Sequence, residues 1–515
     1  MSPHETISVK GMRVLELNSY LYGVTTRLLM ESAGAAVAQV IRERFKDSLR
    51  DMRVKVVLGK GGKAGDGLVC ARHLTPYVRS VEVVMVYETL GHKDAQENLN
   101  IIKSMGSVKI TKFKPGFDLS SDVIIDGLLG IGVKGVVREP IKSVIEQLNR
   151  SSGFKVSIDV PSGIDPDTGE VLGVAVKADL TVTLHKVKPG LLKAKDYVGE
   201  LVVANIGVPV DAELCVGPGD VVYRVKQKPV TAKKGDGGRV LVIAGSKDYI
   251  GAPWLTALAS WYAGADIVLL AAPYPVFTTR FSPEIIPVMF DEPYISPKSI
   301  ENMSEHMAKT DVVVIGPGLS LKNPYLTDTV IKIIDIALTH GKPLVVDADA
   351  LKVLHKVREE RGLDFKGKAV LTPHLGEATY LLNKSLGNMV EDRIKAAIEI
   401  SKKYNVITVL KGYQDVIAEP SGKYRLRRGI GHQDMSRGGT GDVLSGVIAG
   451  LVRRTDNLFD AALAATFINS LSGELAYMHY GMASPLKMLK FIPKIIKDPI
   501  DMVNELFLLK GGDTL

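Results

Sequence analysis

The chain has 515 residues, of which 46% are hydrophobic and 24% are charged. This composition is typical of globular domains and excludes a disordered or fibrous chain, and the length predicts two or more domains. Cys70 and Cys215 are its two cysteines, which excludes a disulfide framework and a zinc site built mainly on thiolates.

The net charge of +8 could favour an anionic partner. The basic residues are dispersed, however, and no basic stripe with interleaved aromatic residues stands out. A phosphate-bearing small molecule or a generally basic proteome explains the charge as well as nucleic acid does, and we expect no nucleic-acid partner. Apolar stretches such as Ile267–Ala272 are far shorter than the roughly 18 residues of a membrane helix. The N-terminus has no apolar signal core. We therefore expect no membrane partner and a cytoplasmic location.

Short apolar runs alternate with helical patterns through most of the chain, which predicts parallel strands covered on both faces. Examples in the first series are Val54–Leu58, Val81–Val86, Val123–Asp126 and Val156–Val160. The second comprises Arg239–Ala244, Ile267–Ala271, Asp311–Ile315, Leu344–Asp347, Ala369–Thr372 and Ile407–Lys411. Val208–Lys234 is rich in Pro, Gly and Lys, which places the boundary near residue 225. We predict two doubly wound α/β/α domains, residues 1–225 and 226–515, and one or two amphipathic helices after Pro485.

The most distinctive motif is Arg437–Asp442, RGGTGD, followed by an apolar stripe of helical period. A glycine-rich turn that opens a helix presents free N–H groups and a positive dipole end to an anion. A carboxylate would oppose phosphate there, so Asp442 is better explained as a base for a hydroxyl that is being phosphorylated. The alternative is a glycine-rich turn in which Asp442 caps the helix.

Polar or glycine-rich loops follow four other predicted strands of this half. They are Gly316-Pro317-Gly318, Asp347-Ala348-Asp349, Thr372-Pro373-His374 with Glu377, and Lys411-Gly412. Each alone is typical of a turn or a cap. Because ligands of doubly wound sheets bind beyond the carboxyl ends of the strands, the four together predict one cleft.

The ordered set of motifs resembles the ADP-dependent NAD(P)H-hydrate dehydratase family over about residues 230–500. It comprises Gly251–Pro253, Gly316–Leu319, Asp347–Leu351, Leu371–Glu377, Leu410–Gly412 and Gly438–Asp442. The resemblance implies a ribokinase-like fold and ADP, or ATP, as phosphoryl donor. The donor would phosphorylate the hydroxyl of the S hydrate, and loss of phosphate would return NADH or NADPH, leaving AMP.

The resemblance also implies residue roles. Asp442 would be the base, and the amides of Gly439, Thr440 and Gly441 would hold negative charge. Lys411, Gly412, His432 and Gly438 would bind ADP with that loop, while Ala252, Gly318 and His374 would line the hydrate pocket with Asp442. Asp347 and Glu377 would act through Mg²⁺ and water. Two departures, His432–Met435 in place of Asn-Pro-Gly-Met and Asp415 in place of Thr, leave the choice between ADP and ATP open.

The N-terminal half has similar loops after its strands: Leu58–Gly67, Asp126–Gly132 and Asp159–Asp165. A glycine loop and two aspartates at strand ends predict a second cleft, although each aspartate alone is typical of a cap. With Met30–Gly34, Lys188–Gly190 and Asn205–Pro209, these segments resemble the NAD(P)H-hydrate epimerase family over about residues 10–215.

This second resemblance implies a Rossmann-like N-terminal domain. It also implies that Asp159 lies at the epimerisation centre and that Asp126 and Ser162 bind K⁺. The implied hydrate contacts are Gly62, Lys63, Ala64, Gly65, Asp66, Gly130, Ile131, Gly132, Val133, Lys134, Gly135, Val136 and Asp159. Gly62 and Lys63 replace two asparagines of the family's loop, and Ala64 replaces a glycine. We hypothesise that Lys63 fills the metal position and pairs with Asp126. The alternative is that Lys63 points to solvent and the epimerase activity is reduced or lost.

The sequence therefore predicts a bifunctional NAD(P)H-hydrate repair enzyme whose small-molecule partners are the NADH and NADPH hydrates and ADP. The family resemblance implies a homo-oligomer. The alternative function is a ribokinase-like small-molecule kinase that leaves phosphate on its product and has a non-catalytic N-terminal binding domain.

Overall fold

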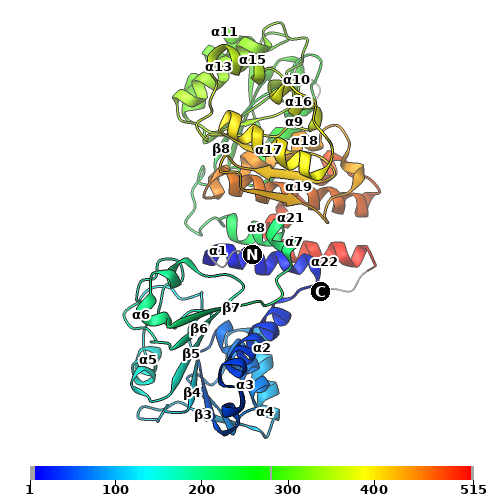
Figure 1. Ribbon diagram of the computed structural model, residues 1–515. Coiled ribbons are helices and arrows are strands. Elements are labelled where there is room, and N and C mark those ends of the chain that lie inside the picture. Colours follow the sequence, from blue (N-terminus) through cyan, green and yellow to red (C-terminus); the bar gives the residue numbers. More distant parts are fainter. Residues whose placement is uncertain (1–5, 279–280, 512–515) are drawn as a thin grey trace. The chain divides into compact units, whose positions relative to one another are not determined.

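The computed structural model describes residues 6–278 and 281–511. The chain divides into two compact units, Met1–Glu213 and Leu214–Leu515 (Figure 1). Each unit contains a mainly parallel sheet that is covered by helices, so the predicted pair of doubly wound α/β/α domains is confirmed.

The division falls earlier than the predicted boundary near residue 225. The helix α8 (Pro218–Arg224) belongs to the second unit, because Arg224 forms an ion pair with Asp460. The N–H of Val216 also donates to the carbonyl of Leu426 over 2.8 Å. These bonds join residues far apart in sequence, so the Pro- and Gly-rich composition of the segment did not reveal them.

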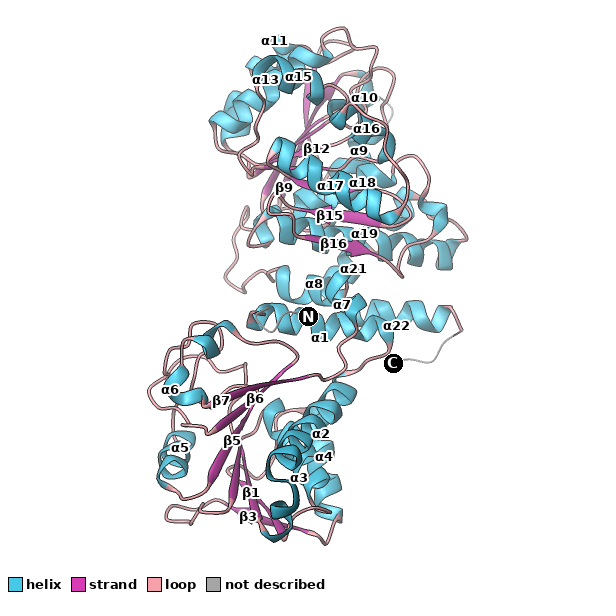
Figure 2. Cartoon of the chain, viewed as in Figure 1, coloured by secondary structure: helices cyan, strands magenta, loops and turns pink. Residues whose placement is uncertain are grey.

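The N-terminal sheet has seven parallel strands in the order β3-β2-β1-β4-β5-β6-β7 (Figure 2). The strands are β1 (Arg53–Leu58), β2 (Ser80–Met85), β3 (Val108–Lys112), β4 (Val123–Gly127), β5 (Phe154–Ile158), β6 (Leu180–Leu184) and β7 (Glu200–Ala204). The helices are α1 (Val9–Asn18), α2 (Thr26–Phe45), α3 (Gly62–Leu74), α4 (Lys93–Ser104), α5 (Ile141–Arg150), α6 (Lys195–Val198) and α7 (Val210–Leu214), with short 3₁₀ turns at Ser19–Tyr22, Lys46–Asp51 and Pro189–Leu192.

Alternate side chains of each strand face opposite layers of helices. Val56 and Leu58 of β1 pack with α2, α3 and α4, whereas Val57 packs with Val144 and Leu148 of α5. Because both faces are buried, the strands are nearly continuous apolar runs. The order of the strands changes direction beside β1 and β4, where the carboxyl ends of strands form a crevice.

The C-terminal sheet has nine strands in the order β10-β9-β8-β11-β12-β13-β14-β15-β16. They are β8 (Arg239–Ile243), β9 (Ile267–Pro273), β10 (Ile286–Phe290), β11 (Val312–Ile315), β12 (Leu344–Val346), β13 (Ala369–Leu371), β14 (Ile407–Leu410), β15 (Asp415–Ala418) and β16 (Tyr424–Arg427). The last two strands pair antiparallel, and β10, β15 and β16 were not predicted.

The remaining helices of this domain are α9 (Ala252–Tyr262), α10 (Pro275–Thr278), α11 (Pro297–Glu301), α12 (Ser304–Ala308), α13 (Leu326–Thr339), α14 (Ala348–Leu351), α15 (Leu354–Arg361), α16 (Leu375–Leu382), α17 (Val390–Tyr404), α18 (Thr440–Leu451), α19 (Leu458–Tyr480), α20 (Pro485–Met488), α21 (Ile492–Lys497) and α22 (Pro499–Leu509), with 3₁₀ turns at Gln433–Met435 and Val452–Arg454. The segment after Pro485 therefore forms three helices rather than one or two. Across residues 6–278 and 281–511, none of the helices combines the length and apolar character needed to cross a membrane.

Helix α18 packs closely on α9, and this contact sets the position of the glycine-rich turn before it. A Cβ atom at Gly446 would lie 2.3 Å from the carbonyl oxygen of Thr256, and one at Gly450 would lie 2.5 Å from that of Ser260. The hydroxyl of Ser260 donates to the carbonyl of Gly446 over 3.0 Å. Two glycines on one face of α18 therefore allow the close approach of the helices.

Candidate active sites

A cavity of about 830 Å³ lies in the C-terminal domain where loops after β12, β13 and β14 meet the start of α18. It is lined by Asp347, Ala348, His374, Lys411, Gly412, Tyr413, Asp415, Arg427, Gly431, His432, Gln433, Met435, Ser436, Arg437, Gly438, Gly439, Thr440, Gly441, Asp442, Leu444, Asn469 and Ser470. A volume of this size suits a drug-sized ligand or a nucleotide. The structure thus brings together His374 and all the residues predicted to bind ADP.

Asp442 lies in the first turn of α18 and lines this cavity. Burial and the neighbouring carboxylate of Asp347 raise the pKa of Asp442 to about 7, although Lys411 opposes the shift. Within the described parts of the chain, no hydrogen bond holds its carboxylate. A carboxylate that titrates near neutral pH and is not committed to another group is suited to accept a proton from a substrate.

Lys411 and Asp347 form an ion pair of 2.8 Å between the end of β14 and the end of β12. Burial lowers the pKa of Lys411, but Asp347, Glu377 and Asp442 raise it by a larger amount, so the ammonium is retained. A Cβ atom at Gly441 would lie 3.1 Å from Nζ of Lys411. The ammonium therefore lies against the first turn of α18, where an anion would bind.

The turn before α18 has a backbone conformation that requires glycine. Gly439 has φ of 98°, and a Cβ atom there would lie 2.7 Å from Cδ1 of Leu255 and 2.9 Å from Cγ of Pro485. The hydroxyl of Thr440 donates to the carbonyl of Met435 over 2.8 Å, which fixes the loop to the helix. The N–H groups at the start of a helix lack partners within the helix, so this turn presents donors to the cavity.

Asp415 lines the cavity, but its carboxylate is already paired. Nε of Arg427 donates to one oxygen over 3.0 Å, and the N–H of Gly412 donates to the other over 2.8 Å. Arg427 also donates to the carbonyl of Gly412 over 2.6 Å. The departure from the family's usual Thr therefore places a loop-fixing ion pair at this position rather than a free negative charge.

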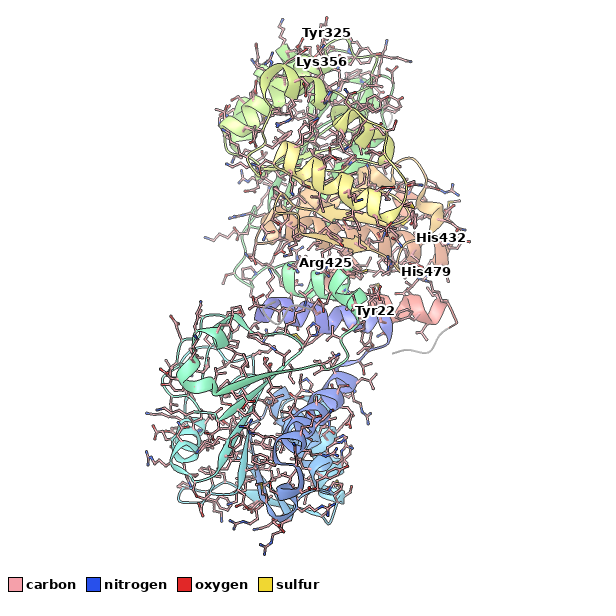
Figure 3. The ribbon with its side chains drawn as sticks, viewed as in Figure 1. Tyr22, Tyr325, Lys356, Arg425, His432 and His479 are labelled. Atoms are coloured by element: carbon pink, nitrogen blue, oxygen red, sulfur yellow. The ribbon has the colours of Figure 1, made fainter. Side chains whose placement is uncertain are left out.

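The loop around His432 is held against α19. The imidazole of His432 stacks on Tyr477 with a centroid distance of 3.5 Å, and its Nδ1 accepts from the N–H of Asp434. His432 lies on the same side of the domain as His479 (Figure 3). Asp434 in turn forms a bidentate ion pair with Arg437 at 3.0 and 2.7 Å. The His432–Met435 sequence thus forms an ordered wall of the cavity.

Of the four residues predicted to contact the hydrate, His374 and Asp442 line the cavity, whereas Ala252 and Gly318 do not. His374 is there, capping α16 by accepting from the N–H of Glu377 over 3.1 Å. Ala252 follows β8 and Gly318 follows β11, the two neighbouring strands that precede β12 in the order of the sheet. The two residues lie close together, because a Cβ atom at Gly318 would lie 3.5 Å from that of Ala252. Ser320, two residues after Gly318, donates its N–H to Asp349 over 3.0 Å, which links this loop to the Asp347 loop.

The carboxylates of Asp347 and Glu377 were predicted to act through Mg²⁺. Both are engaged: Asp347 accepts from Lys411, and Glu377 accepts from the N–H of His374 over 2.9 Å. Among the described residues, no three His, Cys, Asp or Glu side chains are grouped closely enough to hold a metal ion. A Mg²⁺ ion here would therefore depend on phosphate and water ligands in addition to these carboxylates.

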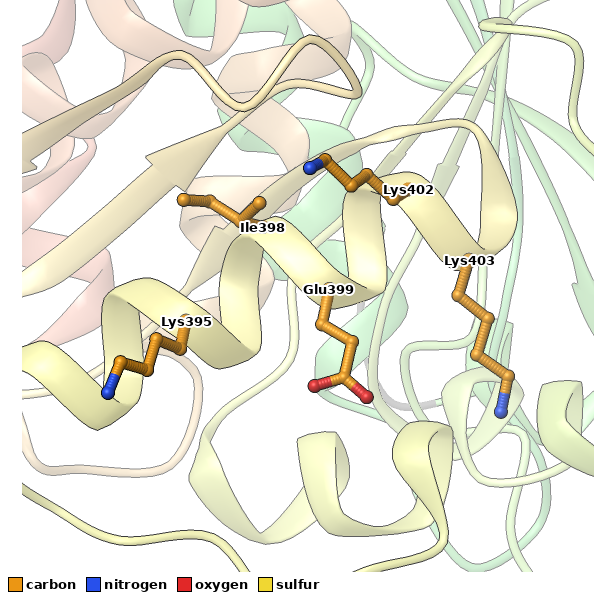
Figure 4. A pocket seen from close by; sticks show the side chains of 5 residues that line it. All are labelled: Lys395, Ile398, Glu399, Lys402 and Lys403. Carbon is orange, nitrogen blue, oxygen red and sulfur yellow. The ribbon is translucent and has the colours of Figure 1, made fainter.

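A second hollow of about 600 Å³ lies on the surface of α17 and is lined by Lys395, Ile398, Glu399, Lys402 and Lys403 (Figure 4). All of these residues come from one helix. The carboxylate of Glu399 pairs with Lys384 at 2.6 Å. This hollow lacks the converging loops of the larger cavity.

In the N-terminal domain, Lys63 is buried in the first turn of α3 and pairs with Asp126 at the end of β4. Its Nζ donates to Oδ2 of Asp126 over 2.9 Å, to the carbonyl of Val160 over 2.8 Å and to Oγ of Ser162 over 3.1 Å. Burial lowers the pKa of Lys63, and Asp126 opposes the shift. Lys63 therefore points to the predicted metal ligands and not to solvent.

Asp159 follows β5 with φ of 62°, a conformation that is strained for a residue with a side chain. Its Oδ1 accepts from Nζ of Lys188 over 2.5 Å and from the N–H of Leu184 over 3.0 Å. Lys188 is fully buried. The structure thus adds Lys188, which the sequence showed only as part of a Lys-Pro-Gly motif, to the predicted centre.

Glu16 of α1 is a further member of this group that sequence reasoning missed. Burial and then Asp159 raise the pKa of Glu16 to about 7. Burial, Asp159 and Glu16 also raise the pKa of Asp66 well above its usual value. The helix α1 reaches this position because the N–H of Ile7 pairs with the carbonyl of Val187 over 2.9 Å. No local sequence pattern signals that contact.

The predicted hydrate-binding loop after β4 lies beside these groups. A Cβ atom at Gly130 would lie 3.3 Å from Cβ of Lys63, and one at Gly132 would lie 3.3 Å from Arg13 of α1. The loop is largely exposed from Gly132 onward, and Val136 is 69% exposed. An exposed loop next to buried carboxylates and ammonium groups is a suitable place for a polar substrate to bind.

Comparison with known proteins agrees with this arrangement. The family model described as NAD(P)H-hydrate dehydratase matches residues 240–494, and the model described as YjeF-related protein N-terminus matches residues 26–190. The chain is 39% identical to the bifunctional NAD(P)H-hydrate repair enzyme of Hyperthermus butylicus over 97% of this chain and 94% of that protein. It is 38% identical to that of Pyrobaculum aerophilum, over 96% of this chain and 98% of that protein.

A solved ribokinase-like superfamily protein from Enterococcus faecalis is also similar, with 22% identity and a TM-score of 0.46 over 55% of this chain and 95% of that chain. The two family models lie on the two structural units, and the curated relatives match nearly the whole chain. The chain therefore belongs to the family of bifunctional NAD(P)H-hydrate repair enzymes.

Proposed function

We propose that the C-terminal domain dehydrates the S epimer of NADH and NADPH hydrates at the expense of ADP. The hydrate hydroxyl oxygen forms a bond to the β-phosphorus of ADP, and the bond from that phosphorus to the bridging oxygen breaks, which releases AMP. The carbon–oxygen bond of the ester then breaks, and phosphate leaves with the electron pair. Loss of a proton from the neighbouring ring carbon restores the double bond of NADH or NADPH.

The observation that carries this proposal is the position of Asp442, a carboxylate with a pKa of about 7 at the start of a helix that lines a nucleotide-sized cavity. In its ionised form it accepts the proton of the hydrate hydroxyl as the new ester bond forms. The backbone N–H groups of the Gly439–Gly441 turn and the ammonium of Lys411 stabilise the charge of the transferred phosphoryl group.

The other lining residues bind the two substrates. Gly412, His432, Gly438 and Thr440 form the ADP part of the cavity, and His374 faces it from the end of β13. Ala252 and Gly318 extend the hydrate part along the same edge of the sheet. Asp347 and Glu377 would help to hold Mg²⁺ through water when it is bound, and the ion would neutralise phosphate charge.

We propose further that the N-terminal domain interconverts the R and S hydrates, so that both epimers reach the dehydratase. The carboxylate of Asp159 and the ammonium of Lys188 form a buried acid–base pair at the crevice of the sheet. Glu16 and Asp66 are neighbouring carboxyl groups with raised pKa values. Glu16, whose pKa is about 7, can take up and return a proton near neutral pH beside this pair and the Gly130–Val136 loop.

The test is to incubate the full-length protein with mixed R and S hydrates and either ADP or ATP, while following the absorbance of the reduced nicotinamide. We expect both epimers to be recovered faster than they interconvert spontaneously, with ADP as donor and free phosphate as product. A product that keeps its phosphate would instead support the small-molecule kinase. Recovery of the R epimer only at the spontaneous rate would leave the N-terminal half as a binding domain.

A further inference from the structure

The ammonium of Lys63 occupies a shell of oxygen atoms that resembles the coordination shell of a metal cation. A carboxylate, a backbone carbonyl and a hydroxyl lie 2.8–3.1 Å from Nζ, and the side chain is only 2% exposed. An ammonium has three N–H donors, and three acceptors surround it. An uncharged amine would have to accept a hydrogen bond in place of one of these contacts, so the acceptors select the charged form.

Other groups of the protein form the remaining hydrogen bonds of Asp126 and Ser162. Asp126 accepts from Oγ of Ser157 and the N–H of Ser162, both over 2.9 Å. Oγ of Ser162 donates to Asp126 over 2.5 Å and accepts from the N–H of Leu129 over 2.8 Å. The family resemblance implies K⁺ at Asp126 and Ser162. That ion does not fit beside Lys63, because the two charges are alike and Nζ already takes the oxygen atoms.

We propose that Lys63 is a tethered replacement for a monovalent metal cation, and that the N-terminal domain therefore folds and works without K⁺. The ammonium joins the end of β4, through Asp126, to the loop after β5, through Val160 and Ser162. The loop that follows β4 carries Gly130, and the loop after β5 carries Asp159. The consequence for catalysis rests on the proposed epimerase function, whereas the consequence for folding does not.

The experiment compares the full-length wild type with Lys63→Asn in KCl, LiCl and choline chloride at equal ionic strength. Asn shortens the side chain and supplies a neutral oxygen, which makes room for an ion. Two quantities are measured: the rate of interconversion of the R and S hydrates, and amide hydrogen exchange in residues 123–162. Lys60→Asn is the matched control for exchange, because Lys60 is an exposed lysine of the same loop.

For the wild type we expect both quantities to agree within twofold in the three salts. For Lys63→Asn we expect exchange in residues 123–162 to be at least tenfold faster in choline chloride than in KCl, with epimerisation reduced in parallel. Li⁺, which is smaller, should restore less than K⁺. Lys60→Asn should exchange like the wild type in every salt.

A saturable K⁺ requirement in the wild type would overturn the proposal, and so would a Lys63→Asn protein whose exchange is fast or slow alike in all three salts. If Lys63→Asn does not fold, Lys63→Met replaces it: this side chain fills the site without charge, so it should exchange faster than the wild type in all salts without rescue by K⁺. A wild type that shows no epimerisation would refute the epimerase function, while its hydrogen exchange would still decide the role of Lys63.

Discussion

Nζ of Lys411 lies 2.8 Å from Oδ1 of Asp347, and both groups act on the carboxyl group of Asp442. The aspartate raises the pKa of Asp442, and the lysine lowers it. The pair thus balances two opposite influences on the proposed base, while burial sets the overall rise. Each member can be removed separately, which makes the balance measurable.

Asp347→Asn and Lys411→Met should therefore move the pH dependence of the dehydratase in opposite directions. Ionisation of Asp442 should limit kcat/KM on the acid side, near pH 7 in the wild type. Asp347→Asn removes a negative charge that raises the pKa of Asp442, so the acid limb of the pH profile should move to lower pH. Lys411→Met removes a positive charge that lowers this pKa, so the acid limb should move to higher pH. Asp335→Asn, on an exposed part of α13, is the control. Shifts in the same direction, or none, would contradict the assigned electrostatics.

Asp442→Asn should stabilise the C-terminal domain at alkaline pH. The pKa of this group rises from 3.8 when the chain is unfolded to about 7 when it is folded. The contribution of Asp442 to the stability of the folded domain is therefore most favourable below pH 3.8, and it is lost as the pH rises through 7. At pH 8 we expect the free energy of unfolding of the variant to be about 1–3 kcal/mol larger than that of the wild type. At pH 4 we expect little difference between the two. Chemical denaturation at the two pH values measures this, and an equal effect at both would be inconsistent with it.

Gly439→Ala should damage the phosphate-binding turn, whereas Gly438→Ala should not. Gly439 has φ of 98° and neighbours at 2.7 and 2.9 Å from an added Cβ, while Gly438 has open space there. A side chain in the left-handed region costs about 1–2 kcal/mol before any clash. We expect Gly439→Ala to lower the stability of the domain by about 1–3 kcal/mol and to weaken ADP binding at least tenfold. Chemical denaturation and calorimetric titration with ADP of both variants would test this. Equal effects of the two substitutions on stability and ADP affinity would contradict the proposed role of the Gly439 conformation.

Glu16→Gln should make the N-terminal domain less sensitive to alkaline pH. The pKa of Glu16 is about 7 in the folded chain against 4.5 for an unperturbed group. The charged groups that act on Glu16 are those of Asp159, Lys188 and Arg13. Because the pKa of Glu16 is raised on folding, the stability that Glu16 contributes below pH 4.5 is lost as the pH rises through 7. The variant should gain about 1–3 kcal/mol at pH 8 relative to pH 5. Hydrogen exchange of β5 in the wild type and the variant, at pH 5 and at pH 8, measures this difference. If the two proteins show the same pH dependence, Glu16 does not titrate between these pH values.

The parts of the structure that could be predicted from the sequence are those governed by local patterns. Val54–Leu58 and Leu344–Asp347 are apolar runs that end in polar loops, and parallel strands bring such ends to one edge. The Arg437–Asp442 motif combines a glycine turn with the start of a helix. These patterns placed Asp347, Lys411 and Asp442 around one cleft.

The parts that could not be predicted depend on contacts between residues far apart in sequence. Asp415 stands where the family usually has Thr, and nothing in the sequence showed that Arg427 of the unpredicted strand β16 pairs with it. Glu16 reaches Asp159 only because the segment before α1 pairs with Val187. The identity of either residue alone carries no sign of its partner.

In the proposed reaction, Asp442 removes the proton of the hydrate hydroxyl. The most direct measurement compares Asp442→Asn with the wild type in the ADP-dependent recovery of reduced nicotinamide from the S hydrate, together with the affinity for ADP. Loss of a general base typically costs about 10²–10⁴-fold in rate, so we expect a loss of at least 100-fold with the ADP affinity within threefold of the wild type. Recovery within twofold of the wild-type rate would contradict the assignment.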